Sequence, residues 1–169
     1  MNRLLFLLVF FLHLFVSCSI VLENSDMESE NLVVNDQGLA DLLKSSPENV
    51  EIRGNKLYLD TYLWRDFMPG AWSGNNGSPL MGSIRFVGQS GDILSNTISI
   101  SKVYVVNNNK IWACGSFEKR IIENNVFEVV VRNGPEWGPD IHVDVICEFR
   151  NVGESFRLKS KTQNINATY

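Results

Sequence analysis

The feature that most constrains the fold of this chain is the spacing of its apolar residues, which changes at Val50. From there on, apolar and polar residues alternate in short runs, and turn-forming residues recur about every eight to twelve positions. The clearest case is 141–150, where apolar side chains occupy every odd position up to 149. Because successive side chains of a β-strand face opposite sides, this pattern predicts strands with one buried face.

About seven main strands are expected after Val50, separated by turns rich in Gly, Asn and Pro. They are expected at 56–64, 80–88, 97–106, 111–117, 126–132, 141–150 and 155–161. A shorter segment, 50–53, is expected to form a hairpin with the first strand through Gly54 and Asn55. The number and spacing of the strands favour an all-β fold, an antiparallel β-sandwich of the immunoglobulin or fibronectin type.

The N-terminus has the pattern of a secretory signal. A short positive segment precedes an almost wholly apolar run from Leu4 to Val16, which is shorter than the roughly 20 residues needed to span a bilayer. The small residue and cysteine that follow resemble the bacterial lipobox, in which the cysteine accepts the lipid. We therefore expect 1–17 to be a lipoprotein signal peptide and Cys18 to be the lipidated residue.

Two other fates of the N-terminus stay open. Cleavage after Ser19 would give an ordinary secreted or periplasmic soluble protein, since Ser17 and Ser19 supply the small residues that such cleavage needs. Alternatively, the apolar run could continue through Leu22 as an uncleaved membrane anchor. All three fates place the remaining chain outside the cytoplasm, and the lipid anchor at the cell envelope is the one we favour.

The remaining chain divides by composition. Residues 18–35 are expected to form a flexible tether, because their middle part, 23–31, is polar and acidic. Residues 36–48 are expected to form a short helical or irregular lead-in, with Asp36 as a helix cap. Residues 49–163 are expected to form the β-sandwich domain, and 164–169 a C-terminal tail.

Charge and motifs exclude several classes of function. The formal net charge is -4 and no block of Lys and Arg is present, which argues against a nucleic-acid partner. Metal-binding spacings such as C-x-x-C and H-E-x-x-H are absent from the sequence, so no metal and no cofactor is expected. Outside the signal the only histidine is His142, and it faces the opposite side of its strand from Cys147. A nucleophilic triad is therefore not expected, and we predict a protein that is not an enzyme.

Four carboxylates lie near expected loop ends: Asp60, Asp66, Glu136 and Asp140. A pair of them working in glycoside hydrolysis stays open.

Cys114 and Cys147 are the two cysteines outside the N-terminal region. Both are expected to point into the core, so a disulfide between them is conceivable in an oxidising compartment. The alternative is a pair of free buried thiols. The choice depends on whether their Cα atoms lie within about 7 Å of each other.

Two loops rich in aromatic residues are the candidates for a binding surface. Phe67 and Trp72 belong to the loop 65–79 and Trp137 to the loop 133–140, and together they could form a platform for a sugar or a peptide. Packing is the alternative interpretation, in which Trp137 closes one end of the sandwich.

The charged pair at the start of the first loop, Arg65 and Asp66, belongs to the same candidate surface. On the packing interpretation the two residues form a local salt bridge.

Three runs carry a resemblance to a group of proteins. The runs Tyr62–Pro69 (YLWRDFMP), Gly77–Leu80 (GSPL) and Gly134–Pro139 (GPEWGP) resemble a group of small bacterial envelope lipoproteins, over roughly 54–162. The resemblance implies location and fold, and it implies no activity.

The function expected is that of an envelope-anchored lipoprotein with a non-catalytic β-sandwich that binds or scaffolds a protein or glycan partner. The alternative is a secreted or anchored enzyme or enzyme inhibitor acting through the loops 65–79 and 133–140. Converging polar groups in a pocket between those loops would favour the alternative.

Overall fold

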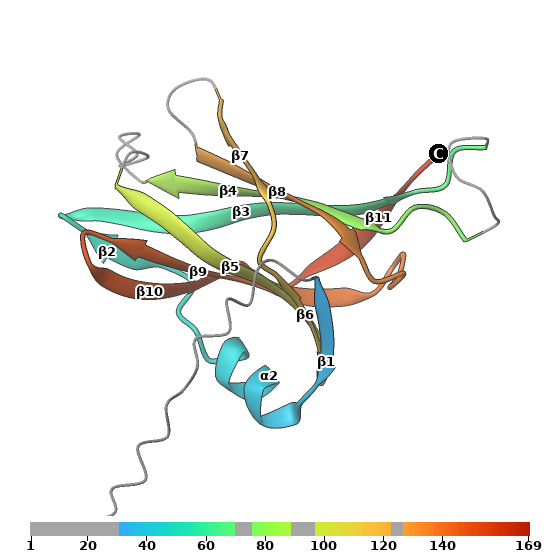
Figure 1. The fold of residues 1–169 in the computed structure, drawn as a ribbon, viewed down its shortest axis with the longest axis horizontal. Helices are drawn as coiled ribbons and strands as arrows, with labels where there is room; N and C mark the ends of the chain where they lie inside the picture. Colours follow the sequence, from blue (N-terminus) through green and yellow to red (C-terminus); the bar gives the residue numbers. More distant parts are fainter. Residues whose placement is uncertain (1–30, 70–75, 89–96, 123–126) are drawn as a thin grey trace, which may run out of the picture.

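The computed structural model describes residues 31–69, 76–88, 97–122 and 127–169, which form an all-β fold with one short helix (Figure 1). The elements are β1 (Leu32–Asn35), α2 (Gln37–Lys44), β2 (Val50–Ile52), β3 (Asn55–Asp66), β4 (Leu80–Gly88), β5 (Ile98–Asn107), β6 (Lys110–Cys114), β7 (Glu118–Ile121), β8 (Phe127–Gly134), β9 (His142–Asn151), β10 (Glu154–Lys159) and β11 (Gln163–Thr168). In the described part of the chain, no helix is long and apolar enough to cross a membrane.

The strands form two layers that are joined at one strand. The first layer contains β1, β6, β5, β9 and β10, and the second contains β2, β3, β4, β8 and β7. β11 joins them, because it pairs antiparallel with β9 and parallel with β3. The expected all-β sandwich is confirmed, although the described residues form eleven strands instead of about seven, and β11 and β3 pair in parallel.

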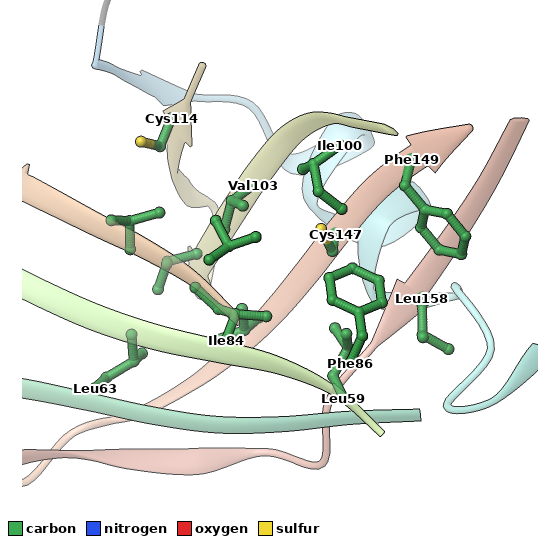
Figure 2. Packing of buried hydrophobic residues seen from close by; sticks show 14 of the residues in the cluster. Leu59, Leu63, Ile84, Phe86, Ile100, Val103, Cys114, Cys147, Phe149 and Leu158 are labelled. Carbon is green, nitrogen blue, oxygen red and sulfur yellow. The ribbon is translucent and has the colours of Figure 1, made fainter. Parts of the chain in front are cut away.

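The main core fills the space between the layers. Phe86 of β4 and Phe149 of β9 meet edge to face with ring centroids 5.3 Å apart, and both are fully buried. Figure 2 shows their rings among side chains from both layers, including Leu59 and Ile100. The alternation read from the sequence supplies these inward side chains, and their burial is the main favourable term in folding.

A smaller cluster lies on the outside of the first layer, under helix α2. Ala40 and Leu43 of the helix are buried against three strand residues, Val106, Ile111 and Ile146. Ile146 occupies an even position in β9, where a solvent-facing strand would carry a polar residue, and the helix explains why it is apolar. The expected cap is confirmed, since a side-chain oxygen of Asp36 accepts a hydrogen bond from the Leu39 backbone N–H at 3.0 Å.

Two predicted boundaries are wrong. The expected tether, 18–35, ends earlier, because 32–35 is strand β1 and pairs with β6. The expected C-terminal tail, 164–169, is mostly strand β11 and lies between β9 and β3. Ile165 anchors β11, because its side chain is fully buried and its backbone N–H donates to the Ile141 carbonyl at 3.0 Å.

Candidate functional site

Arg65 lies near the end of β3 and joins the two loops that the sequence singles out. The residue is only 3% exposed. Its Nε donates to the Ser78 carbonyl at 2.7 Å, and its Nη2 donates to the Asn76 carbonyl. Its Nη1 donates to the carbonyls of Gly138 at 3.0 Å and Glu136 at 3.2 Å. The structure therefore brings the loops 65–79 and 133–140 together around one guanidinium.

The salt bridge expected between Arg65 and Asp66 does not occur among the ion pairs of the described residues. The Asp66 carboxylate instead accepts hydrogen bonds from the Met68 backbone N–H at 2.9 Å and from Thr168 Oγ1 at 3.5 Å. This part of the packing interpretation is wrong because the guanidinium bonds to backbone carbonyls, two from its own loop and two from the loop 133–140. Their positions depend on the tertiary fold and leave no local signal in the sequence.

Phe67 and Trp137, the aromatic residues of these loops that the structure describes, are packed against their neighbours. The Phe67 ring lies under the Arg65 guanidinium, 5.1 Å from its central carbon, and 6.0 Å from the Tyr169 ring. A Cβ on Gly77 would lie 2.6 Å from the Phe67 ring, so this loop fits closely around it. Trp137 is half-buried against the main core, as the packing interpretation expects.

Two predicted site residues, Cys18 and Trp72, lie outside the described residues.

The four candidate carboxylates do not form one group. Asp60 lies in the middle of β3, six residues before Asp66, which is about 20 Å along a strand. Glu136 and Asp140 are exposed, and no hydrogen bond or ion pair in the described ranges joins either of them to Asp66. Within the same ranges, no three or more His, Cys, Asp or Glu side chains are placed to hold a metal ion.

Cys114 and Cys147 are both buried free thiols, as the alternative interpretation expects. Each lies opposite Val103 of β5, Cys114 on one neighbouring strand and Cys147 on the other. Two strand spacings separate their Cα atoms by about 10 Å, beyond the roughly 7 Å that a disulfide allows. Burial raises the pKa of the Cys114 thiol to about 11 and raises that of Cys147 still further, so neither is a nucleophile at neutral pH.

His142 is exposed and is opposite Asn164 of β11 in the strand register. Cys147 is fully buried in the same strand, so His142 and Cys147 face different environments, as the sequence predicts.

One side of β3 is unpaired in the middle of the strand, and the sequence does not predict this feature. On one side β3 pairs with β4 without interruption from Leu57 to Trp64. On its other side β2 pairs only up to Leu57, and β11 pairs only from Leu63 onward. Figure 1 shows β2 near one end of β3 and β11 near the other. We call the intervening side of β3, residues 58–62, the open flank.

The register fixes which backbone groups face the open flank. The β2–β3 hairpin turns through Arg53 and Gly54 at φ of 52° and 77°, and such a two-residue turn is closed by a hydrogen-bonded pair. The odd-numbered residues of β3 therefore direct their N–H and C=O toward β2. At the other end the Leu63 carbonyl points toward β11 and accepts from the side-chain Nδ2 of Asn166 at 3.0 Å, which continues the same alternation. Leu59 and Thr61 thus direct their N–H and C=O groups into the open flank.

A hollow of about 800 Å³ lies along the open flank. It is lined by β3 from Tyr58 to Thr61, by Lys56 and Val87, by Glu48 and Asn49 ahead of β2, and by 159–163 between β10 and β11. Within this lining, Gln163 Nε2 donates to Thr61 Oγ1 and lies 3.5 Å from Ser160 Oγ. The hollow therefore combines unpaired strand backbone with hydroxyl, amide and ammonium groups.

The side chains that line the hollow have a positive net charge, whereas the whole chain has a negative one. Three lysines and two carboxylates line it, whereas the formal net charge of the chain is -4. One of the carboxylates, Asp60, lies 4.0 Å from the Arg85 guanidinium outside the hollow. Lys159 donates from Nζ to the Lys44 carbonyl at 2.9 Å. Lys56 and Lys161 are exposed.

Aromatic side chains continue from the hollow along the outer face of β3. Tyr58 and Tyr62 are 42% and 49% exposed. The Tyr62 ring stacks on Trp64, with centroids 5.6 Å apart. Tyr58 belongs both to this row and to the lining of the hollow, so the two surfaces are continuous.

The fold and this site define an all-β sandwich with a polar hollow beside an unpaired strand segment. Searches of protein-family models, of curated proteins and of solved structures found no match to the chain.

Proposed function

We propose that this chain is an exported lipoprotein, held at the cell envelope through lipid on Cys18, whose β-sandwich is a non-catalytic binding module. The observation that carries the binding role is the hollow of about 800 Å³ beside the open flank. Pockets that hold small ligands are commonly about 300–1,000 Å³. The signal-like run that ends at Cys18 supports the anchor.

The chemistry of the lining favours binding over catalysis. Neither histidine nor cysteine occurs among its residues, so the usual general base and thiol nucleophile are missing from it. Its serine, Ser160, is 3% exposed and donates from Oγ to the Lys161 carbonyl at 3.0 Å. These groups can hold a polar ligand through hydrogen bonds and charge.

The alternative, an enzyme or inhibitor acting through the loops 65–79 and 133–140, has less support. The hydrogen bonds described for the Arg65 guanidinium all go to backbone carbonyls, which hold the two loops together.

The anchor is tested by phase partition in a bacterial host that makes lipoproteins. The full chain is expected in the detergent phase with an acylated Cys18 by mass spectrometry, and Cys18→Ser is expected in the aqueous phase. A mature protein that begins at Ile20, or an intact Met1, would contradict the anchor.

The binding role is tested by mapping amide chemical shifts on the isotope-labelled protein. One sample receives a pool of soluble cell-wall oligosaccharides and another a pool of short peptides. Shifts are expected at 58–61 and 159–163, and mass spectrometry is expected to recover both pools unchanged. Shifts confined to 65–69 and 134–140, or chemical conversion of either pool, would favour the enzyme or inhibitor instead.

A further inference from the structure

We propose that the open flank binds an extended, acidic peptide segment, which adds to β3 as a short strand between β2 and β11. This inference rests on the proposed binding module and names its class of ligand. A peptide differs from other ligands in carrying N–H and C=O groups at the spacing of a strand, and the open flank presents the matching set.

The backbone of β3 is the first part of the argument. Leu59 and Thr61 direct two N–H and two C=O groups into the hollow, and no described strand pairs with them on that side. Between Leu57, which pairs with β2, and Leu63, which pairs with β11, β3 advances about 20 Å at about 3.4 Å per residue. That length accommodates an added strand of about four residues.

The edge at the end of the second layer is protected against such addition, whereas β1, at the end of the first layer, carries no charged residue. β7, at the end of the second layer, carries Glu118, Lys119 and Arg120, and all three are exposed. Charged side chains on an edge discourage pairing with another chain. The open flank carries a single charged residue, Asp60, so it is less protected in this way than β7.

The lysines that line the hollow favour an acidic sequence for the added strand. Lys56 and Lys161 line the hollow, are exposed, and have no ion pair among the described residues. Of the two carboxylates in the lining, Asp60 lies 4.0 Å from Arg85, and Glu48 is exposed, so the lining has one more lysine than carboxylates. Acidic side chains on the peptide would meet these lysines, and opposite charges across an interface raise the rate of association and select the partner.

The backbone part is tested with a matched pair of variants, Thr61→Pro and Thr61→Val. Both remove the hydroxyl that accepts from Gln163, but only proline also removes the N–H that faces the hollow. Proline is tolerated at a strand edge whose N–H faces outward, so the β3–β4 ladder is retained. Circular dichroism and the thermal midpoint check that both variants fold.

The probe is a random seven-residue peptide library displayed on phage and selected on the immobilised protein. Enriched peptides are expected to be acidic and rich in β-branched residues. For the synthesised consensus peptide, Thr61→Pro is expected to weaken binding at least about tenfold relative to Thr61→Val, from one lost hydrogen bond and one unpaired carbonyl. Equal affinity for the two variants would overturn strand addition.

The charge part is tested with Lys161→Glu, with Lys110→Glu on the remote β6 as the control. Lys161→Glu is expected to weaken binding of the same peptide several-fold and to reduce the loss of affinity as NaCl is raised. Enrichment of neutral or basic peptides, or an equal effect of both variants, would overturn the preference for acidic peptides.

Failure of this inference can be told apart from failure of the binding module. If no peptide is enriched but oligosaccharides shift the amides at 58–61, the ligand is a glycan and the peptide proposal is wrong while the module stands. If neither class of ligand shifts these amides, both proposals are contradicted.

Discussion

Replacing Arg65 with methionine tests whether this residue holds the two loops together. Methionine keeps a long unbranched side chain but removes all four hydrogen bonds to the loop carbonyls. The carbonyls of the exposed residues Asn76 and Glu136 can turn to water, whereas that of the fully buried Ser78 cannot. The cost therefore comes mainly from the bonds to Ser78 and Gly138.

The size of the effect follows from those two bonds. Hydrogen bonds from a charged donor contribute about 1.5–3 kcal/mol each, and relief of the buried charge offsets part of that loss. We expect Arg65→Met to lower the free energy of unfolding by about 3 kcal/mol. With a urea slope of about 2 kcal/mol per M, the midpoint should fall by about 1.5 M.

Urea unfolding followed by tryptophan fluorescence measures this shift. Arg65→Lys is the control for charge, because it keeps the cation but cannot reach four carbonyls at once. It is expected to lose nearly as much stability as Arg65→Met. A midpoint within about 0.3 M of the parent for Arg65→Met, at an unchanged slope, would show that the loops do not depend on this residue.

Three further predictions concern other parts of the fold. Burial raises the pKa of the Cys114 thiol from an ordinary 9.0 to about 11, so the free energy of unfolding should fall as the pH rises from 9 to 11. Cys114→Ala should weaken that fall in urea titrations, and an unchanged fall would assign it to other groups. Ile165→Ala should lower the free energy of unfolding by about 2–5 kcal/mol because the Ile165 side chain is fully buried. Asn164→Ala, at an exposed position, should leave it nearly unchanged. Equal effects of the two variants would contradict the central place of β11. Gly38→Ala should stabilise the protein by about 0.5–1 kcal/mol and raise its thermal midpoint, because the added Cβ would meet only Asp36 Oδ1 at 3.5 Å. A lowered midpoint would refute this prediction.

The sequence predicts best the strands in which apolar residues alternate. β9 and β4 bury their alternate residues as expected, because two-residue periodicity and burial have the same physical origin. β11 escaped prediction because Ile165 is its only large apolar residue and its other side chains are mostly polar. Its stability depends on partners that come from distant parts of the chain.

The candidate site could also be predicted only in part, because its geometry depends on segments that are distant in the sequence. Inward-facing cysteines follow from alternation, but whether Cys114 and Cys147 can bond depends on the strand between them. Two of the four hydrogen bonds of Arg65 go to Glu136 and Gly138, more than 70 residues away in the chain. The open flank is a property of strand order, since it arises where β2 ends and β11 begins.

The position of β11 in the chain also affects when the two layers can be joined during folding. It is the last described strand in the chain, yet it is the strand that joins the two layers. During synthesis, every other described strand emerges before the segment 163–168 that joins the layers. Such distant pairing slows folding, because the chain must close a long loop before the contact forms. On the proposed route to the envelope, late closure would keep the chain open during its passage across the membrane.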